Sequence, residues 1–224
     1  MKIAAAFNYL FGSFFNKKNI RITHSLNFLF RKREIDRNYM DHIRLATLEL
    51  ISAEINSKNI PGAVAELGVY KGKFARYINQ YFPDRKLYLF DTFEGFSKAD
   101  ISTEIQQGFS SGEQNFSNTS VDEVLSRMPF REQCIIKQGY FPQSSEGIEE
   151  EFVFVSIDTD LYDPIYNGLC YFYPRLLKGG YIFIHDYNND AYKGAKQAVE
   201  KFCAENGINK VPLPDSCGTA VLCK

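Results

Sequence analysis

The sequence has few cysteines, and none of them lie close together. Its five cysteines are scattered, and no C-x-x-C pair occurs. A zinc site needs clustered ligands and a disulfide framework needs an even set, so the pattern indicates neither. Free thiols are typical of a reducing compartment, and we therefore expect a cytoplasmic protein. The cysteines are Cys134, Cys170, Cys203, Cys217 and Cys223.

An excess of charge of one sign is also lacking. The formal net charge is −1, and no long basic stripe occurs, so we expect no nucleic-acid partner. One short basic stretch is present, made of Arg31, Lys32 and Arg33. We interpret it as solvated charge, with phosphate binding as the alternative.

The sequence also lacks a long hydrophobic run. Residues 3–15 contain few polar side chains, but a membrane span needs about 20 apolar residues. No small-residue cleavage site follows them, so we expect neither a transmembrane segment nor a signal peptide. We interpret residues 1–38 as a helical arm that packs on the domain, covers its active site or forms a dimer contact. Docking to a membrane surface is the alternative, through Phe7, Leu10, Phe11, Phe14 and Phe15.

The remaining residues, 39–224, suit one α/β domain. Apolar runs predict strands over 63–67, 86–90, 133–137, 152–157 and 181–184. Helical patterns cover 39–58, 73–80, 120–128, 164–177 and 191–206, with a turn at 178–180 and a closing hairpin of 210–213 and 219–222. This alternation predicts an α/β fold: a doubly wound, Rossmann-like, mostly parallel sheet with an antiparallel C-terminal edge strand and an N-terminal helical extension.

A polar stretch, residues 97–118, is too long for a plain connection in a compact domain. We interpret it as a lid loop over the donor and acceptor sites, with a disordered surface loop as the alternative. Phe109 and Phe116 favour a segment that packs.

Acidic residues end four of the five predicted strands, and ligands of open parallel sheets bind beyond the carboxyl ends of the strands. The first strand leads into E-x-G-x-x-x-G, from Glu66 to Gly72. Glycines let the backbone approach a ligand, whereas a carboxylate repels a pyrophosphate and attracts a cation. The pattern therefore favours the sulfonium and ammonium groups of S-adenosylmethionine over a nicotinamide dinucleotide. Asp91, 23 residues after Gly68, is the candidate ligand of the ribose hydroxyls.

The predicted cofactor-binding residues are Glu66, Leu67, Gly68, Tyr70, Gly72, Asp91, Thr92, Phe93, Gln138, Gly139, Tyr140 and Asp158. Of these, Tyr140 follows the third strand, where the adenine is expected and where an aromatic ring can stack.

Four segments resemble the macrocin O-methyltransferase family: residues 66–69, 91–96, 157–162 and 179–187. The likeness runs from about Tyr39 to Phe202. Members methylate sugar hydroxyls in macrolide and aminocoumarin biosynthesis, and related sequences sit with bacterial surface-glycan pathways. The resemblance implies S-adenosylmethionine as donor and a small-molecule sugar or glycoside as acceptor. We also expect a homo-oligomer.

The resemblance further implies a divalent metal, usually Mg²⁺, held by Asp158 and an acidic pair after the fifth strand. Here that pair is His185 and Asp186. Mg²⁺ prefers oxygen ligands, and imidazole suits softer metals. Three possibilities stay open: Asp158 and Asp186 hold Mg²⁺ with waters, His185 joins them on another metal, or no metal binds.

Asp160 resembles the proposed general base of the family. A sugar hydroxyl is a poor nucleophile, so its proton must leave as the methyl group transfers. His185 is the second candidate base, because its ordinary pKa is about 6.5, and it could also be structural. A nicotinamide-dependent dehydrogenase and a non-catalytic protein with this fold are the competing hypotheses.

Overall fold

The computed structural model describes residues 2–17 and 41–224. The chain divides into two compact units, Met1–Met40 and Asp41–Lys224. In the first, the described residues form helix α1 (Lys2–Asn16). The rest of the predicted arm, with the basic stretch at 31–33, lies outside the described residues. No helix in the described ranges is both long and apolar enough to cross a membrane.

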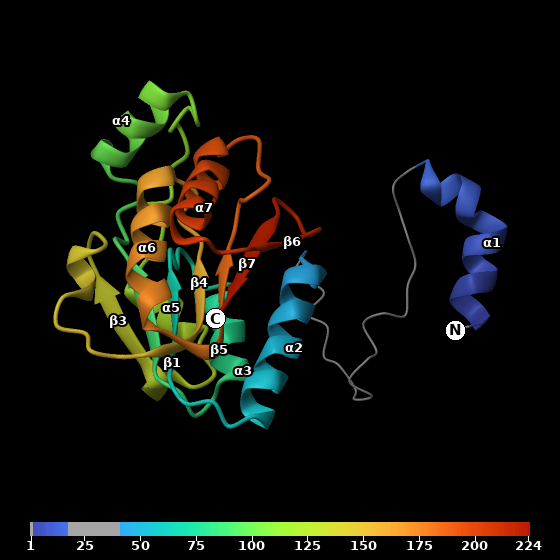
Figure 1. Ribbon diagram of the computed structural model, residues 1–224, viewed down its shortest axis with the longest axis horizontal. Helices are drawn as coiled ribbons and strands as arrows, with labels where there is room; N and C mark the ends of the chain where they lie inside the picture. Colours follow the sequence, from blue (N-terminus) through green and yellow to red (C-terminus); the bar gives the residue numbers. More distant parts are fainter. Residues whose placement is uncertain (1, 18–40) are drawn as a thin grey trace. The chain divides into compact units, whose positions relative to one another are not determined.

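The second unit is built on one seven-stranded sheet in the order β3-β2-β1-β4-β5-β7-β6 (Figure 1). All neighbouring strands are parallel except β7, which is antiparallel to β5 and β6. This confirms the predicted doubly wound sheet, with β7 lying inside the edge strand β6. The strands are β1 (Ala63–Leu67), β2 (Leu87–Asp91), β3 (Cys134–Gln138), β4 (Phe152–Ile157), β5 (Leu176–Ile184), β6 (Val211–Leu213) and β7 (Thr219–Cys223).

Helices cover both faces of the sheet (Figure 1). Helices α6 and α7 pack on one face, and α2 and α3 cover the other. The helices are α2 (His42–Ser57), α3 (Ala75–Tyr81), α4 (Lys98–Gln107), α5 (Val121–Ser126), α6 (Tyr162–Arg175) and α7 (Lys193–Asn206), with 3-10 turns at Arg131–Gln133 and Gln143–Ser145.

Side-chain alternation along β1 decides what each face receives. Ala63, Ala65 and Leu67 join the core beneath α6 and α7, so Glu66 lies on the face toward α2 and α3. All six residues of the neighbouring β4 are buried, as expected of a central parallel strand. A carboxylate is thereby placed inside the protein, next to the end of the strand.

Two details differ from the predicted elements. Strand β5 begins at Leu176, and the predicted turn at 178–180 lies within it, because the register against β4 shifts between Phe152 and Phe154. Helix α2 is present, but its buried face is not made by the apolar residues alone. Ile43 and Leu50 are 39% and 43% exposed, whereas Arg44 is 3% exposed.

Candidate active site

The carboxyl ends of the parallel strands align at one edge of the sheet. Leu67 of β1 pairs in register with Phe90 of β2 and Ile157 of β4, and Ile157 pairs with Ile184 of β5. The acids next to these positions therefore emerge side by side. We call this group the acidic rim: Glu66, Asp91, Asp158, Asp160 and Asp186.

The glycine loop after β1 passes against the end of β4. Gly68 has a φ of +85°, and a Cβ there would lie 2.1 Å from the carbonyl oxygen of Asp158. Its N–H donates to the Phe90 carbonyl at 2.9 Å. Only glycine fits this position, because both the conformation and the space exclude a side chain.

Asp91 organises this loop through backbone hydrogen bonds. Its Oδ2 accepts from the N–H groups of Val69 and Tyr70, both at 2.8 Å, and its Oδ1 accepts from Phe93 at 2.7 Å. A carboxylate has about four acceptor sites, so one site remains. Ribose binding by Asp91 stays a prediction, and the structure shows that Asp91 also positions the loop.

The other predicted cofactor residues lie around the same edge. The Gly139 N–H donates to the Asp91 carbonyl at 2.9 Å, which places Gln138 and Gly139 beside the loop. Thr92 donates through Oγ1 to the Gly95 carbonyl at 2.8 Å. Gly72, farther along the loop, has a φ of +71°.

Tyr70 and Tyr140 are held by their hydroxyl groups. Tyr70 donates to Asn118 Oδ1 at 2.7 Å, and Tyr140 donates to Asp100 Oδ1 at 2.6 Å. Burial and the bond to Asp100 raise the pKa of Tyr140 to about 12, so the phenol stays protonated. Adenine stacking on Tyr140 stays a prediction.

Glu66 carries an incomplete set of hydrogen bonds. It is 1% exposed and accepts from the N–H of Ala75 at the start of α3, but its Oε2 has no partner among the described residues. Burial and the nearby charge of Asp158 raise the pKa of Glu66 well above its usual range. A buried oxygen without a partner is costly, and a cationic ligand would complete it.

Asp158 binds two cationic side chains. Arg44 Nη1 donates to its Oδ2 at 2.9 Å, and His185 Nδ1 lies 3.2 Å from its Oδ1. Arg44 also donates to Ser156 Oγ at 3.0 Å and stacks 3.8 Å above the ring of Phe74. Burial alone would raise the pKa of Asp158, but the two cations hold it well below its usual range.

His185 lies between two carboxylates. Its Nδ1 is 2.8 Å from Asp186 Oδ2 in addition to its contact with Asp158. Burial lowers the pKa of His185, yet the attraction of Asp158 and the hydrogen bonds outweigh it and raise the pKa to about 10. The imidazole is therefore positively charged at neutral pH in the unliganded protein, and its role as the second candidate base stays a prediction.

Asp160 and Asp186 form a pair of acids in strained backbone conformations. Both have a φ of +60°, and Tyr70 and Phe93 add two more of the six non-glycine residues with positive φ in the described part of the chain. Burial, followed by the charges of Asp186 and Asp158, raises the pKa of Asp160 well above its usual range. Strain of this kind gathers at functional sites, and here it gathers at the acidic rim.

Two groups of possible metal ligands share His185. Asp158, His185 and Asp186 have ligand atoms within 4.8 Å of one another, and so do Asp41, His185 and Asp215. The first group contains the predicted ligands. In the second, Asp41 already caps α2 by accepting from the Arg44 N–H, and Asp215 accepts from Thr219.

The stretch 97–118, which the sequence predicts to be a lid loop, contains a helix, because residues 98–107 form α4. Ser97 caps the helix by accepting from the Asp100 N–H at 3.1 Å, and Gly108 ends it with a φ of +66°. Both are ordinary signals of helix start and stop, which the polar composition obscured. The role of a lid stays a prediction.

Helix α4 is fixed to the site by two buried acids. Asp100 accepts from Tyr140, and Glu104 Oε1 accepts from the N–H of Tyr162 at 2.8 Å. Tyr162 is the first residue of α6, directly after the segment that carries Asp158 and Asp160. Helix α4 therefore connects Tyr140, on the side predicted for the adenine, with the start of α6, next to the predicted catalytic residues.

Sequence reasoning missed two residues of the site. Arg44 lies 114 residues from its partner Asp158. The one signal in the sequence was its helical spacing, which puts it on the same face of α2 as the buried Leu48, Ile51 and Ile55. Tyr192 is 5% exposed and its hydroxyl has no partner among the described residues. Burial and the charges of Asp160 and Asp186 raise the pKa of Tyr192, so this phenol lies near the acid pair.

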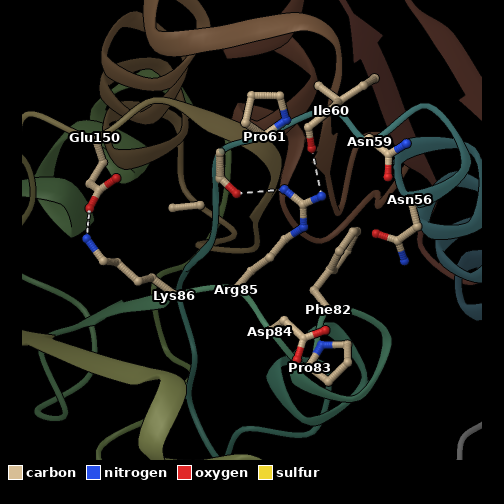
Figure 2. A pocket seen from close by; sticks show the side chains of 12 residues that line it. Asn56, Asn59, Ile60, Pro61, Phe82, Pro83, Asp84, Arg85, Lys86 and Glu150 are labelled. Carbon is tan, nitrogen blue, oxygen red and sulfur yellow. Dashed lines mark hydrogen bonds and ion pairs between the residues drawn. The ribbon is translucent and has the colours of Figure 1, made fainter.

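An open cavity of about 760 Å³ lies at the opposite ends of β1 and β2 (Figure 2). Arg85 donates there to the carbonyls of Ile60 and Gly62 at 2.7 and 2.8 Å, and Lys86 pairs with Glu150. None of its lining residues is a predicted site residue. Its basic side chains are occupied by the protein itself, so it is not the candidate active site.

Known sequences resemble this chain over most of its length. The family model described as Macrocin-O-methyltransferase (TylF) matches residues 34–222. Mycinamicin III 3''-O-methyltransferase from Micromonospora griseorubida is 27% identical over 164 residues, which cover 67% of this chain and 63% of that protein. The 8-demethyl-8-(2,3-dimethoxy-alpha-L-rhamnosyl)-tetracenomycin-C 4'-O-methyltransferase of Streptomyces olivaceus is 25% identical over 190 residues, with coverage of 80% and 71%.

Solved structures share the fold. The O-methyltransferase NovP has a TM-score of 0.64 and 21% identity, covering 81% of this chain and 79% of its own. CalS11, a calicheamicin methyltransferase, has a TM-score of 0.64 and 19% identity, with coverage of 80% and 77%. At these identities the likeness establishes the architecture alone.

The raised pKa of Glu66 predicts a pH-dependent loss of stability that Glu66→Gln removes. In the unfolded chain Glu66 ionises above its ordinary value of 4.5. Between that value and the higher folded pKa the folded state binds more protons, so stability falls as pH rises. The melting temperature of the variant minus that of the wild type should therefore grow from acidic to neutral pH in calorimetry.

The exposed Glu149→Gln is the matched control, and its difference from the wild type should stay constant with pH. If the Glu66→Gln difference is equally constant, the buried carboxyl does not have the raised pKa that the geometry implies.

Proposed function

This chain belongs to the macrocin O-methyltransferase family, and from that premise we propose that it transfers the methyl group of S-adenosylmethionine to a sugar hydroxyl. The observation that carries the proposal is the buried Oε2 of Glu66 in the acidic rim, which no described residue contacts by a hydrogen bond. S-adenosylmethionine brings two positive charges, a sulfonium and an ammonium. Either charge would stabilise the ionised form of these carboxylates, which their closeness to one another and their partial desolvation disfavour.

The donor would lie along the glycine loop. Gly68 leaves no side chain between the ligand and the strand end, and Asp91 holds the loop through Val69 and Tyr70. Glu66 would pair with the ammonium group, and the remaining acceptor site of Asp91 would bind a ribose hydroxyl. Because the loop is already fixed before binding, little ordering would be required.

Asp160 would accept the proton of the acceptor hydroxyl. In the unliganded site its raised pKa keeps it protonated beside Asp186. The positive charge of the bound donor would lower that pKa and convert Asp160 to the base at the moment it is needed. A positioned base contributes about 10²–10⁴-fold to the rate, and in-line orientation of the methyl group and oxygen contributes up to ~7–11 kcal/mol.

A divalent metal fits the donor set of Asp158, His185 and Asp186, whose ligand atoms lie within 4.8 Å. Asp158 and Asp186 would supply carboxylate oxygens, as Mg²⁺ prefers, and His185 could add a nitrogen if it gives up its proton. When bound, the ion would lower the pKa of the acceptor hydroxyl. Arg44 already neutralises part of the charge of Asp158, so it would lower the affinity for the ion.

The acceptor side is lined by aromatic rings. Phe96 packs edge-to-face with Phe116 and Tyr192, at centroid distances of 5.1 and 6.4 Å. Aromatic faces can stack on the apolar side of a sugar ring, and the Tyr192 hydroxyl would supply a hydrogen bond. The names of two relatives, a mycinamicin III 3''-O-methyltransferase and a rhamnosyl-tetracenomycin-C 4'-O-methyltransferase, support a sugar or glycoside acceptor here as well.

We also propose a cytoplasmic location and a homo-oligomeric state. All five cysteines are free, which suits a reducing compartment. The oligomeric state is a prediction from the sequence and is testable by light scattering.

Binding of the donor separates the proposed enzyme from its two competitors. A ligand that binds only the folded state raises the melting temperature. S-adenosylmethionine should stabilise the wild type in a thermal-shift experiment, Glu66→Gln should respond less, and nicotinamide dinucleotide should have no effect. Stabilisation by the dinucleotide alone would favour a dehydrogenase, and no response to either ligand would favour a non-catalytic protein.

Substitution of Asp160 tests its role as base. Asp160→Asn keeps the shape of the side chain but cannot accept the proton, so turnover should fall about 10²–10⁴-fold with donor affinity nearly unchanged. Turnover is measured with a sugar acceptor and donor affinity by calorimetry. Weakened donor binding with normal turnover at saturation would show that Asp160 binds the donor instead.

Chelation tests the metal site. If Asp158 and Asp186 hold the ion, a chelator should abolish wild-type activity and added Mg²⁺ or Mn²⁺ should restore it. Asp158→Ala should have low activity that neither chelator nor metal alters. Wild-type activity that is indifferent to chelators would rule out the metal and leave Arg44 and His185 as the resident cations of the site.

A further inference from the structure

Helix α1 has an apolar stripe at helical spacing. Phe7, Leu10, Phe11 and Phe14 each lie three residues from one of the others and four residues from another, which places them on one side of the helix. Leu10 is 72% exposed and Phe14 is 63% exposed. The helix contains no acidic residue. Large apolar side chains that are this exposed and lie together are characteristic of an interaction site.

The charges of the chain are divided between its two units. Residues 1–33 hold seven lysines and arginines and no acid. Over residues 1–40 the numbers are eight basic and two acidic, whereas residues 41–224 hold 18 basic and 25 acidic. The overall charge of −1 thus conceals a cationic N-terminal segment on an anionic catalytic unit. Such asymmetry points to a partner with negative charge.

We infer that α1 docks on the surface of an anionic lipid bilayer. An apolar stripe and a cationic flank are the two features that bind a helix in the plane of the interface, by burial of rings among acyl chains and by attraction to anionic headgroups. The 15 residues of α1 are too few to span the roughly 30 Å hydrocarbon core. The helix therefore lies on the membrane and does not cross it.

Other occupants of the stripe fit the observations less well. A second copy of the chain would explain the apolar residues but would bring seven like charges against seven. Nucleic acid would explain the charge but not the exposed Leu10 and Phe14. An anionic bilayer accounts for both features with one partner.

Vesicle co-sedimentation of the full chain tests the inference. Vesicles of phosphatidylcholine alone are compared with vesicles of phosphatidylcholine and phosphatidylglycerol in equal parts. The wild type should bind the anionic vesicles, and binding should weaken as salt is raised because the headgroup attraction is screened. Neither result depends on methyl transfer, so failure here leaves the proposed function untouched.

Two variants with the same change of charge separate the stripe from the charge. Leu10→Asp places a carboxylate on the stripe, and Ser13→Asp places one at an exposed residue outside the stripe. Leu10→Asp should weaken binding about tenfold or more beyond Ser13→Asp, because burial of a leucine is lost. Equal binding by the two variants would overturn the inference.

Three further results would also overturn it. One is a wild type that stays in the supernatant with anionic vesicles. Another is a wild type that is dimeric and does not bind vesicles, together with a monomeric Leu10→Asp variant. That result would identify a second copy of the chain as the partner of the stripe. The last is tighter binding to double-stranded DNA than to vesicles.

Discussion

Repulsion among carboxylates at one edge of a parallel sheet is the constraint on which this site depends. The register of β1, β2, β4 and β5 leaves no freedom in where their following residues emerge. Acids brought this close in a partly desolvated place must be neutralised, protonated or paired. Each solution is present: Arg44 and His185 pair with Asp158, and Asp160 is the protonated acid beside Asp186. Burial favours the protonated form of Glu66, whose Oε2 has no partner among the described residues.

The same constraint links the scaffold to the chemistry. Buried cations and protonated acids stabilise the unliganded protein. A cationic ligand can take over this role, because its positive charge lowers the pKa of every nearby group. Asp91 stands apart, because three backbone N–H groups of its neighbourhood already bind it. Asp91 fixes the conformation of the loop, while the other acids of the rim create a negative potential that attracts a cation.

The sequence was sufficient for the sheet, because β1 and β4 are short apolar runs between glycines and acids. It was also sufficient for the membership of the acidic rim, since parallel strands bring their carboxyl ends together. It was insufficient for Arg44, whose partner lies 114 residues away, and for the unpartnered hydroxyl of Tyr192. It also failed for α4, where Asp100 and Glu104 are buried by contacts with other elements and read as polar loop residues in isolation. Partners distant in sequence leave no local pattern.

The most direct measurement is a crystal structure with S-adenosylhomocysteine bound, read at the carboxylate of Glu66. We predict that the ammonium group of the ligand lies within hydrogen-bond distance of Oε2, the atom that has no partner among the residues 2–17 and 41–224. A ligand bound away from the ends of β1 and β4, or a ligand that leaves Glu66 Oε2 without contact, would contradict it.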